Sequence, residues 1–220
     1  MSAIAEMFDG IAPTYDALNR VLSLGIDRRW RRRAVAALGP LDGKWILDVC
    51  AGTLDLSRLC EREGAKVVSV DFARAMLERG RGKLRRARLV CADALRMPFL
   101  DGSFDGALCG FGLRNLPDPA AGLREMRRVL APGARLAVLD FFRPAGAARV
   151  IQSLYNRRFV PLVGGALSGD RAAYDYLAQS IERFASVEEA EAMMRAAGFL
   201  NTRSNLLTFG VAALLVGEAS

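Results

Sequence analysis

The chain contains no histidine. This absence excludes every mechanism that needs an imidazole, including a Ser-His-Asp triad, a histidine general base and a histidine-ligated metal. Acid–base chemistry must therefore fall to carboxylates, tyrosine, cysteine, lysine or water. The four cysteines form no Cys-x-x-Cys pair, so we expect neither a disulfide framework nor a metal site. We expect the cysteines to be small, buried apolar side chains.

Long apolar segments are also missing. No run approaches the roughly 18 residues that a membrane-spanning helix needs. Residues 1–17 lack the basic start and apolar core of a secretory signal. We therefore expect a cytoplasmic protein. Its 220 residues, of which 52% are hydrophobic, suffice for one large domain with a full core.

Positive charge is abundant and clustered. The net charge is +7, and arginines concentrate in two blocks, at residues 27–33 and 79–88. Such blocks bind nucleic acid or an anionic membrane surface, or they form the solvated face of a helix. We expect no nucleic-acid partner, because basic charge is the only feature of the sequence that suggests one. The first block is a candidate for peripheral contact with anionic lipid at the inner face of the membrane.

Short apolar segments alternate with amphipathic ones. We predict strands at 45–49, 66–70, 88–91, 104–109 and 135–139, helices at 56–63, 73–85 and 119–130, and a terminal strand pair over 200–207 and 210–216. Asp118 is a candidate N-cap, and Ser186 and Glu189 have the spacing of a capping box. The alternation is typical of a mostly parallel, doubly wound α/β sheet with helices on both faces.

Acidic and small residues follow three predicted strands. Residues 46–57 run from the first strand through a small-residue turn into a helix, and acids recur at the next two strand ends. The candidate ligand-binding residues are Asp48, Gly52, Thr53, Asp71, Asp93 and Ala94. Doubly wound sheets bind ligands beyond the carboxyl ends of their strands, where an acid such as Asp71 can accept two ribose hydroxyls. Ordinary caps and turn acids are the alternative.

The turn after the first strand lacks the Gly-x-Gly-x-x-Gly spacing. That spacing lets a dinucleotide pyrophosphate approach the backbone. The segment Cys50–Leu54 therefore argues for a nucleoside ligand without pyrophosphate, and S-adenosylmethionine fits.

Several segments carry a family resemblance, the most specific being Phe111–Asn115, with others at 8–19, 22–31, 124–130 and 174–181. With these segments the chain resembles the class I methyltransferases, and more closely the UbiE-type C-methyltransferases of menaquinone and ubiquinone biosynthesis. The resemblance implies one Rossmann-like domain with a seven-stranded sheet. Its parts would be an N-terminal helical lid (1–40), a cofactor-binding core (41–142), a substrate-side insertion (143–185) and a C-terminal helix with a strand pair (186–220).

The resemblance also implies an activity. S-adenosylmethionine would donate a methyl group to a ring carbon of a polyprenyl quinol, with demethylmenaquinol the favoured substrate. Arg114 would stabilise charge on the quinol oxygen, Asn115 would orient the substrate or a water, and Tyr15 would relay a proton or cover the site. The structural alternatives are an ion pair for Arg114, a loop cap for Asn115 and packing for Tyr15.

Leu54 departs from the family pattern, since relatives usually carry glycine there. Glycine adopts positive φ readily and lets the backbone approach a ligand. We expect leucine to add bulk beside the methionine portion of the cofactor. A methyltransferase-fold scaffold with impaired cofactor binding, and a methyltransferase acting on another small molecule, therefore stay open. The sequence does not decide the quinone ring or the oligomeric state, which leaves room for a homodimer.

Overall fold

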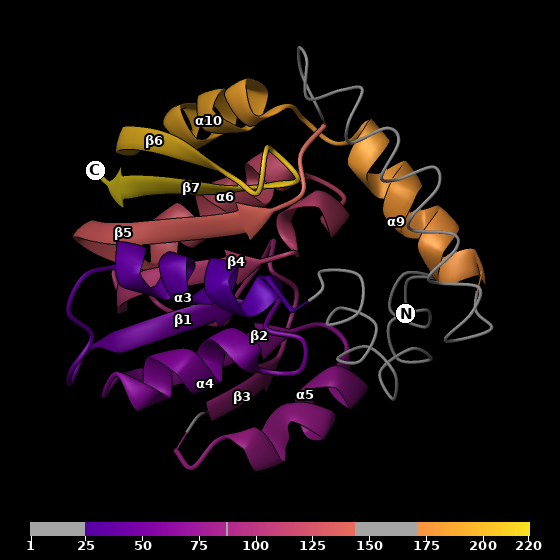
Figure 1. Ribbon diagram of the computed structural model, residues 1–220. Coiled ribbons are helices and arrows are strands. Elements are labelled where there is room, and N and C mark those ends of the chain that lie inside the picture. The colour runs from indigo at the N-terminus through magenta and orange to yellow at the C-terminus, as the bar shows by residue number, and fades with distance from the viewer. Residues whose placement is uncertain (1–24, 87, 144–170) are drawn as a thin grey trace.

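The computed structural model describes residues 25–86, 88–143 and 171–220 (Figure 1). Most of the expected lid, including Tyr15, and most of the expected insertion lie outside these residues. The described helices are α3 (Asp27–Ala37), α4 (Asp55–Arg62), α5 (Arg74–Gly80), α6 (Pro119–Val129), α9 (Arg171–Arg183) and α10 (Val187–Ala196), with short 3₁₀ helices η1 (Arg81–Lys83) and η2 (Leu113–Asn115). The strands are β1 (Trp45–Val49), β2 (Lys66–Asp71), β3 (Arg88–Cys91), β4 (Phe104–Gly110), β5 (Leu130–Asp140), β6 (Phe199–Leu207) and β7 (Ala212–Ala219).

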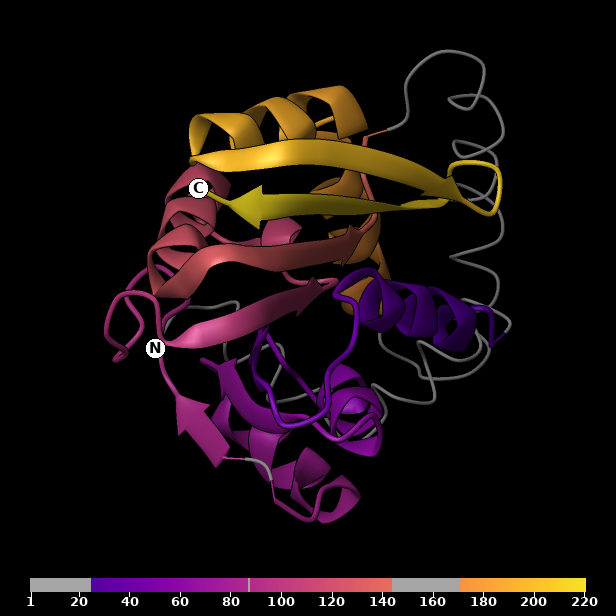
Figure 2. The ribbon, with the colours of Figure 1, turned by 90° about the vertical axis from the view of Figure 1, so that its left-hand side faces the viewer.

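The seven strands form one sheet in the order β3-β2-β1-β4-β5-β7-β6. Strands β1 to β5 pair parallel with one another, whereas β7 pairs antiparallel with both β5 and β6 (Figure 2). The connections reverse direction between β1 and β4. A crevice at this switch point is where open α/β sheets bind ligands. The predicted fold class is therefore confirmed.

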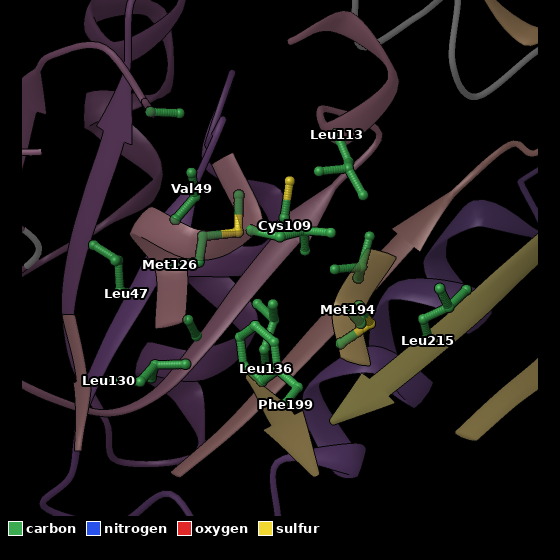
Figure 3. Close-up of a cluster of buried hydrophobic side chains, with 14 of the residues drawn as sticks. Leu47, Val49, Cys109, Leu113, Met126, Leu130, Leu136, Met194, Phe199 and Leu215 are labelled. Carbon is green, nitrogen blue, oxygen red and sulfur yellow. The ribbon is translucent and has the colours of Figure 1, made fainter. Parts of the chain in front are cut away.

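Side chains from alternate strand positions build a core on each face of the sheet. On β1, Leu47 and Val49 join a core with residues of α6 and α10, whereas Ile46 joins the core under α3 and α4. Figure 3 shows the first of these cores, with Met126 of α6 and Met194 of α10 pointing onto the strands. Both cores are needed because a mostly parallel sheet must be covered on both faces.

Two predicted helix caps are confirmed. The Asp118 carboxylate accepts from the Ala121 amide at 2.9 Å. The Ser186 hydroxyl accepts from the Glu189 amide at 3.2 Å, and the Glu189 carboxylate accepts from the Ser186 amide at 2.8 Å. These contacts satisfy amides at the starts of α6 and α10 that have no partner within the helix.

Some predicted boundaries were wrong. The helix expected over 73–85 ends at Gly80 and continues as η1. Strand β5 starts at Leu130 rather than 135, because Leu130 already pairs with Phe104 before the register shifts. Cys60 and Cys109 are buried as expected, but Cys91 is exposed and Cys50 is half-buried. Within the described ranges, no helix is long and apolar enough to cross a membrane.

Candidate functional site

A pocket lies at the carboxyl ends of β1, β2 and β4, beside the switch point of the sheet. Its empty volume, with the open mouth included, is about 430 Å³. The lining residues are Cys50, Gly52, Asp71, Phe72, Met76, Gly110, Phe111, Gly112, Asn115 and Leu116. Three segments therefore meet here: the loop after β1, the start of the β2–α5 connection, and residues 110–116 after β4.

Asp71 is the acidic group of the pocket. One carboxylate oxygen accepts from the Gly52 amide and the other from the Ala73 amide, both at 2.8 Å. These bonds hold the loop after β1 against the end of β2. Each carboxylate oxygen has a second lone pair, so Asp71 can also accept from hydroxyl groups of a ligand.

Close backbone approach shapes the opposite wall. A Cβ at Gly112 would lie 2.3 Å from the Cβ of Cys50 and 2.8 Å from its sulfur. Cys50 itself has a positive φ of 55°, which is a strained conformation for a residue with a side chain. The segment after β4 can lie against the loop after β1 only because residue 112 has no side chain.

Leu54 does not line the pocket. Its side chain is fully buried, and a Cβ at Gly80 would lie 2.6 Å from its Cγ. The leucine side chain therefore packs against the end of α5, and the expected crowding of the cofactor stays a prediction. Leucine in place of glycine affects the backbone, because Leu54 must adopt a positive φ of 69°.

Asp48 lies beneath the pocket rather than on its surface. Its carboxylate accepts from the Ser57 amide at 2.9 Å and from the Ser57 hydroxyl at 2.5 Å, and that hydroxyl also contacts the Ser69 hydroxyl at 2.7 Å. The other oxygen, Oδ1, is buried with no hydrogen-bond partner in the described part of the chain. Complete burial raises the pKa of Asp48 to about 7. Asp48 therefore ties β1 to the first turn of α4.

Three further candidates for cofactor contact, Thr53, Asp93 and Ala94, do not line the pocket either. Thr53 and Ala94 are buried, and Ala94 belongs to the core around α6. Asp93 is exposed, and its carboxylate accepts from the Leu95 amide at 2.9 Å. Leu95, two residues further along, lies near the pocket residue Leu116, because both side chains approach Gly122.

Arg114 is held in a buried ion pair. Its Nη1 lies 2.5 Å from a carboxylate oxygen of Asp140, and the two side chains are 7% and 0% exposed. The same nitrogen donates to the Phe111 carbonyl at 2.8 Å, and Nε donates to the Ser180 hydroxyl at 3.4 Å. Arg114 thus joins η2, the end of β5 and α9. These contacts match the structural alternative, and Arg114 is not among the lining residues.

Asn115 lines the pocket, and its amide is oriented by two contacts. Nδ2 donates to the Phe111 carbonyl at 3.2 Å, and Oδ1 accepts from the Tyr176 hydroxyl at 3.2 Å. A carbonyl can only accept, so Nδ2 must face Phe111 and Tyr176 must donate. Burial raises the pKa of Tyr176, which keeps this phenol protonated at neutral pH.

Arg31 differs from the rest of its arginine block. Its side chain is buried, its guanidinium lies 5.1 Å from the centre of the Phe111 ring, and its Nε lies 3.4 Å from an Asp27 oxygen. Trp30 packs against the same ring with centroids 6.4 Å apart. The start of α3 therefore supports one wall of the pocket.

The structure brings together only part of the predicted site. Gly52, Asp71 and Asn115 line the pocket, whereas Tyr15 lies outside the described residues. Our prediction missed Phe72 and Met76, whose only sequence signal is that they follow the acid at the end of β2. It also missed Tyr176, although this residue lies in one of the segments that carry the resemblance.

The pocket's chemistry suits a nucleoside. Apolar side chains of Phe72, Met76 and Leu116 stand near the single carboxylate of Asp71. A purine ring needs apolar faces, and a ribose needs an acceptor for its hydroxyls. The described residues therefore fit the nucleoside portion of S-adenosylmethionine.

Comparison with known proteins extends the likeness to the whole chain. The profile of the ubiE/COQ5 methyltransferase family matches residues 2–218. A protein of Thermus thermophilus named demethylmenaquinone methyltransferase is 48% identical, over 96% of this chain and 99% of that protein. A protein of Geobacter sulfurreducens named ubiquinone/menaquinone biosynthesis C-methyltransferase UbiE is 40% identical, over 98% of this chain and 88% of that protein.

Solved structures support the fold. An S-adenosylmethionine-dependent methyltransferase of Thermotoga maritima superposes with a TM-score of 0.71 over 98% of this chain and 99% of that one, at 20% sequence identity. The methyltransferase architecture predicted from the sequence is thus confirmed by shape as well as by sequence.

Proposed function

Since the chain belongs to the ubiE/COQ5 methyltransferase family, we propose that it transfers a methyl group from S-adenosylmethionine to a ring carbon of a polyprenyl quinol. Demethylmenaquinol is the favoured substrate. The observation that carries this proposal is the 48% identity to the Thermus demethylmenaquinone methyltransferase over nearly the full length of both chains.

When bound, the cofactor supplies an electrophilic methyl group on a sulfonium. Asp71 accepts from the ribose hydroxyls, while Phe72 and Met76 offer apolar faces to the adenine. Gly52 and Gly110 leave room on the remaining walls. The family resemblance implies that Thr53, Asp93 and Ala94 contact the cofactor as well, whereas Asp48 acts from beneath by tying β1 to α4.

On the substrate side, the site must stabilise the negative charge that develops on the quinol oxygen. A ring carbon of a hydroquinone becomes a good nucleophile when the neighbouring hydroxyl loses its proton, so the site must favour the phenolate and align the carbon with the methyl group. Asn115 donates a hydrogen bond from its amide to the substrate oxygen. Arg114, which belongs to η2, contributes positive potential to the site, although Asp140 compensates its charge. Tyr15 is proposed as a proton relay or cover.

The direct test is methyl transfer with purified protein, methyl-labelled S-adenosylmethionine and demethylmenaquinol, read by mass spectrometry of the quinone. Label on the ring supports the proposal, and its absence from the ring contradicts it. Polyprenyl benzoquinols that lack the ring methyl group, tested in parallel reactions, identify the ring type. An Asp71→Ala variant should lose most cofactor affinity and serves as the negative control.

The scaffold alternative has lost its main structural support, because the Leu54 side chain does not enter the pocket. Calorimetry with S-adenosylhomocysteine separates the two functions. Micromolar binding supports the enzyme, and no binding at millimolar ligand supports the scaffold. Methylation of a different small molecule would appear as label outside the quinone fraction.

The remaining proposals concern location and partners. We place the protein in the cytoplasm, in peripheral contact with the inner face of the membrane, where a polyprenyl quinol resides. No nucleic-acid partner is proposed. A homodimer stays a prediction, and sedimentation equilibrium of the purified chain tests it.

A further inference from the structure

The turn between β6 and β7 has a backbone that its residues do not favour. Thr208 and Phe209 have φ angles of 47° and 55°, and Gly210 follows at 87°. The loop between the paired residues Leu207 and Ala212 has four residues, and a β-branched threonine with positive φ is a genuine outlier. Strain of this kind is kept where the residues serve a purpose.

Each strained residue has a different environment. The Thr208 hydroxyl accepts from the indole N–H of Trp30 at 3.0 Å, which fastens the turn to α3. Phe209 is 89% exposed, the highest exposure of any large apolar side chain in the described ranges. The turn is thus anchored on one side and displays an aromatic ring to solvent on the other.

The helix beside this turn presents positive charge. Arg28, Arg29, Arg32 and Arg33 are exposed on α3, while the acidic residue of that helix, Asp27, is buried against Arg31. Ile26, just before the helix, is partly exposed as well. The outer face of α3 therefore carries arginines with no exposed acid among them.

The turn and the start of α3 lie at the edge of the sheet where the pocket opens. Figure 2 shows the β6–β7 turn at the end toward which the arrows of β4 and β5 point, with α3 beside it. Side chains connect it to the site, since Trp30 bonds Thr208 and also packs on the pocket residue Phe111. The second arginine block differs, because Arg85 and Arg86 lie at the opposite edge, just before β3, where their amides donate to the Glu61 carboxylate near the end of α4.

We propose that this edge docks on an anionic bilayer. Phe209 inserts among the acyl chains, and Arg28, Arg29 and Arg32 bind the phosphate headgroups. An exposed ring beside clustered arginines is the combination that binds interfaces, because apolar burial and attraction to anionic lipid add. The benefit for catalysis rests on the proposed function: the pocket would face the layer that holds the quinol.

The test is flotation of the full chain with vesicles that contain neither quinol nor cofactor. We expect binding to vesicles with 30 mol% phosphatidylglycerol and little binding to pure phosphatidylcholine. Phe209→Ser should lower the partition constant about tenfold or more. Replacing Arg28, Arg29 and Arg32 by Gln should lower it about fivefold for each arginine, and 0.5 M salt should act likewise.

Matched controls lie at the opposite edge. Leu100 is 83% exposed in the loop before β4, so Leu100→Ser removes a similar apolar side chain. Gln at the exposed Arg62, Arg85 and Arg86 removes the same number of charges. Both control variants should float like the wild type. In a Phe209→Trp variant, the fluorescence of the new tryptophan should be quenched by lipids with brominated acyl chains.

Several outcomes would overturn the docking edge. These are no flotation with anionic vesicles, equal losses in target and control variants, salt-sensitive RNA binding in place of vesicle binding, or a dimer that Phe209→Ser dissociates. Methyl transfer to a short-chain, water-soluble quinol is measured separately. A chain that methylates this quinol but does not float refutes the docking edge alone, and one that floats without activity refutes the proposed function alone.

Discussion

The side chain of Leu54 occupies the space that a side chain at Gly80 would need. A Cβ at residue 80 would lie 2.6 Å from Leu54 Cγ and 2.7 Å from the backbone carbonyl of Thr53. The end of α5 can therefore lie against the loop after β1 only while residue 80 is glycine. This contact explains how the chain accommodates a leucine at a position where the family resemblance led us to expect glycine.

Gly80→Ala is expected to destabilise the fold by about 1–3 kcal/mol, because a Cβ would press on backbone that cannot swing aside. Affinity for S-adenosylhomocysteine should fall as well, since Gly52 lies on the same displaced loop. Urea unfolding and calorimetry measure the two effects. Gly82→Ala is the matched control, because nothing lies within 4 Å of a Cβ at that position. Equal behaviour of the two variants would contradict the packing argument.

Leu54→Gly should lower stability while leaving cofactor affinity nearly unchanged. Loss of a fully buried leucine costs about 2–5 kcal/mol, and relief of the left-handed backbone returns about 1 kcal/mol of that. The side chain does not line the pocket, so we expect the dissociation constant of S-adenosylhomocysteine to stay within about threefold. A tenfold gain in affinity would show that the leucine crowds the ligand after all.

Arg114 and Asp140 should behave as one buried unit. Removing either partner leaves an uncompensated buried charge, which costs about 3–5 kcal/mol. We expect Arg114→Met and Asp140→Asn each to lower the urea midpoint strongly, and the double variant to lose less than the two single losses added. The exposed Arg143–Glu189 pair, at 2.7 Å, is the control and should contribute less than about 1 kcal/mol. Additive losses would argue that the arginine acts independently of Asp140.

Much of this architecture was predictable because it depends on local patterns. The first and last residues of the strands Trp45–Val49 and Arg88–Cys91 were predicted correctly. Short apolar runs between turn residues leave little choice of where a strand begins and ends. The capping box at Ser186 was equally local. The acids at the ends of β1 and β2 were predicted from strand spacing alone, and Asp71 does line the pocket.

The roles of individual side chains were harder to predict, because they depend on contacts between distant segments. Nothing near Arg114 in the sequence shows that Asp140 will neutralise it. Likewise, nothing near Leu54 shows that Gly80 makes room for it. The Tyr176–Asn115 contact joins residues 61 positions apart. Such pairings are decided by tertiary packing, which a single sequence reveals only through resemblance.

Tyr176→Phe should slow catalysis with little effect on cofactor binding. The variant removes the hydroxyl that donates to Asn115 Oδ1, so the amide loses one of the two contacts that orient it. A hydrogen bond of about 1.4 kcal/mol corresponds to a tenfold loss in kcat. Methyl transfer assays should show that loss at nearly unchanged KM for S-adenosylmethionine.

A double-variant cycle separates this positioning role from general damage. In an Asn115→Ala background, Tyr176→Phe should have almost no further effect on kcat, because the group that it orients is gone. An undiminished tenfold loss in that background would mean that Tyr176 acts on the reaction by another route.

Asp48 should make stability depend on pH in the direction opposite to an ordinary surface carboxylate. Its pKa is raised from 3.8 to about 7 in the folded protein by burial, so the native state keeps a proton that the unfolded chain has lost. The free energy of unfolding therefore falls as pH rises from about 4 to about 7, by up to about 1.4 kcal/mol per pH unit. Above that range this group adds no further pH dependence.

Asp48→Asn removes the titrating group while keeping an oxygen that can accept from Ser57. Urea midpoints measured from pH 4.5 to 8 should fall with pH in the wild type and change less in the variant. Ser57→Ala provides a second check. The Ser57 hydroxyl lowers the pKa of Asp48 against the larger effect of burial, so its removal should extend the decline to higher pH. Parallel curves for all three proteins would show that Asp48 is ionised in the folded state throughout this range.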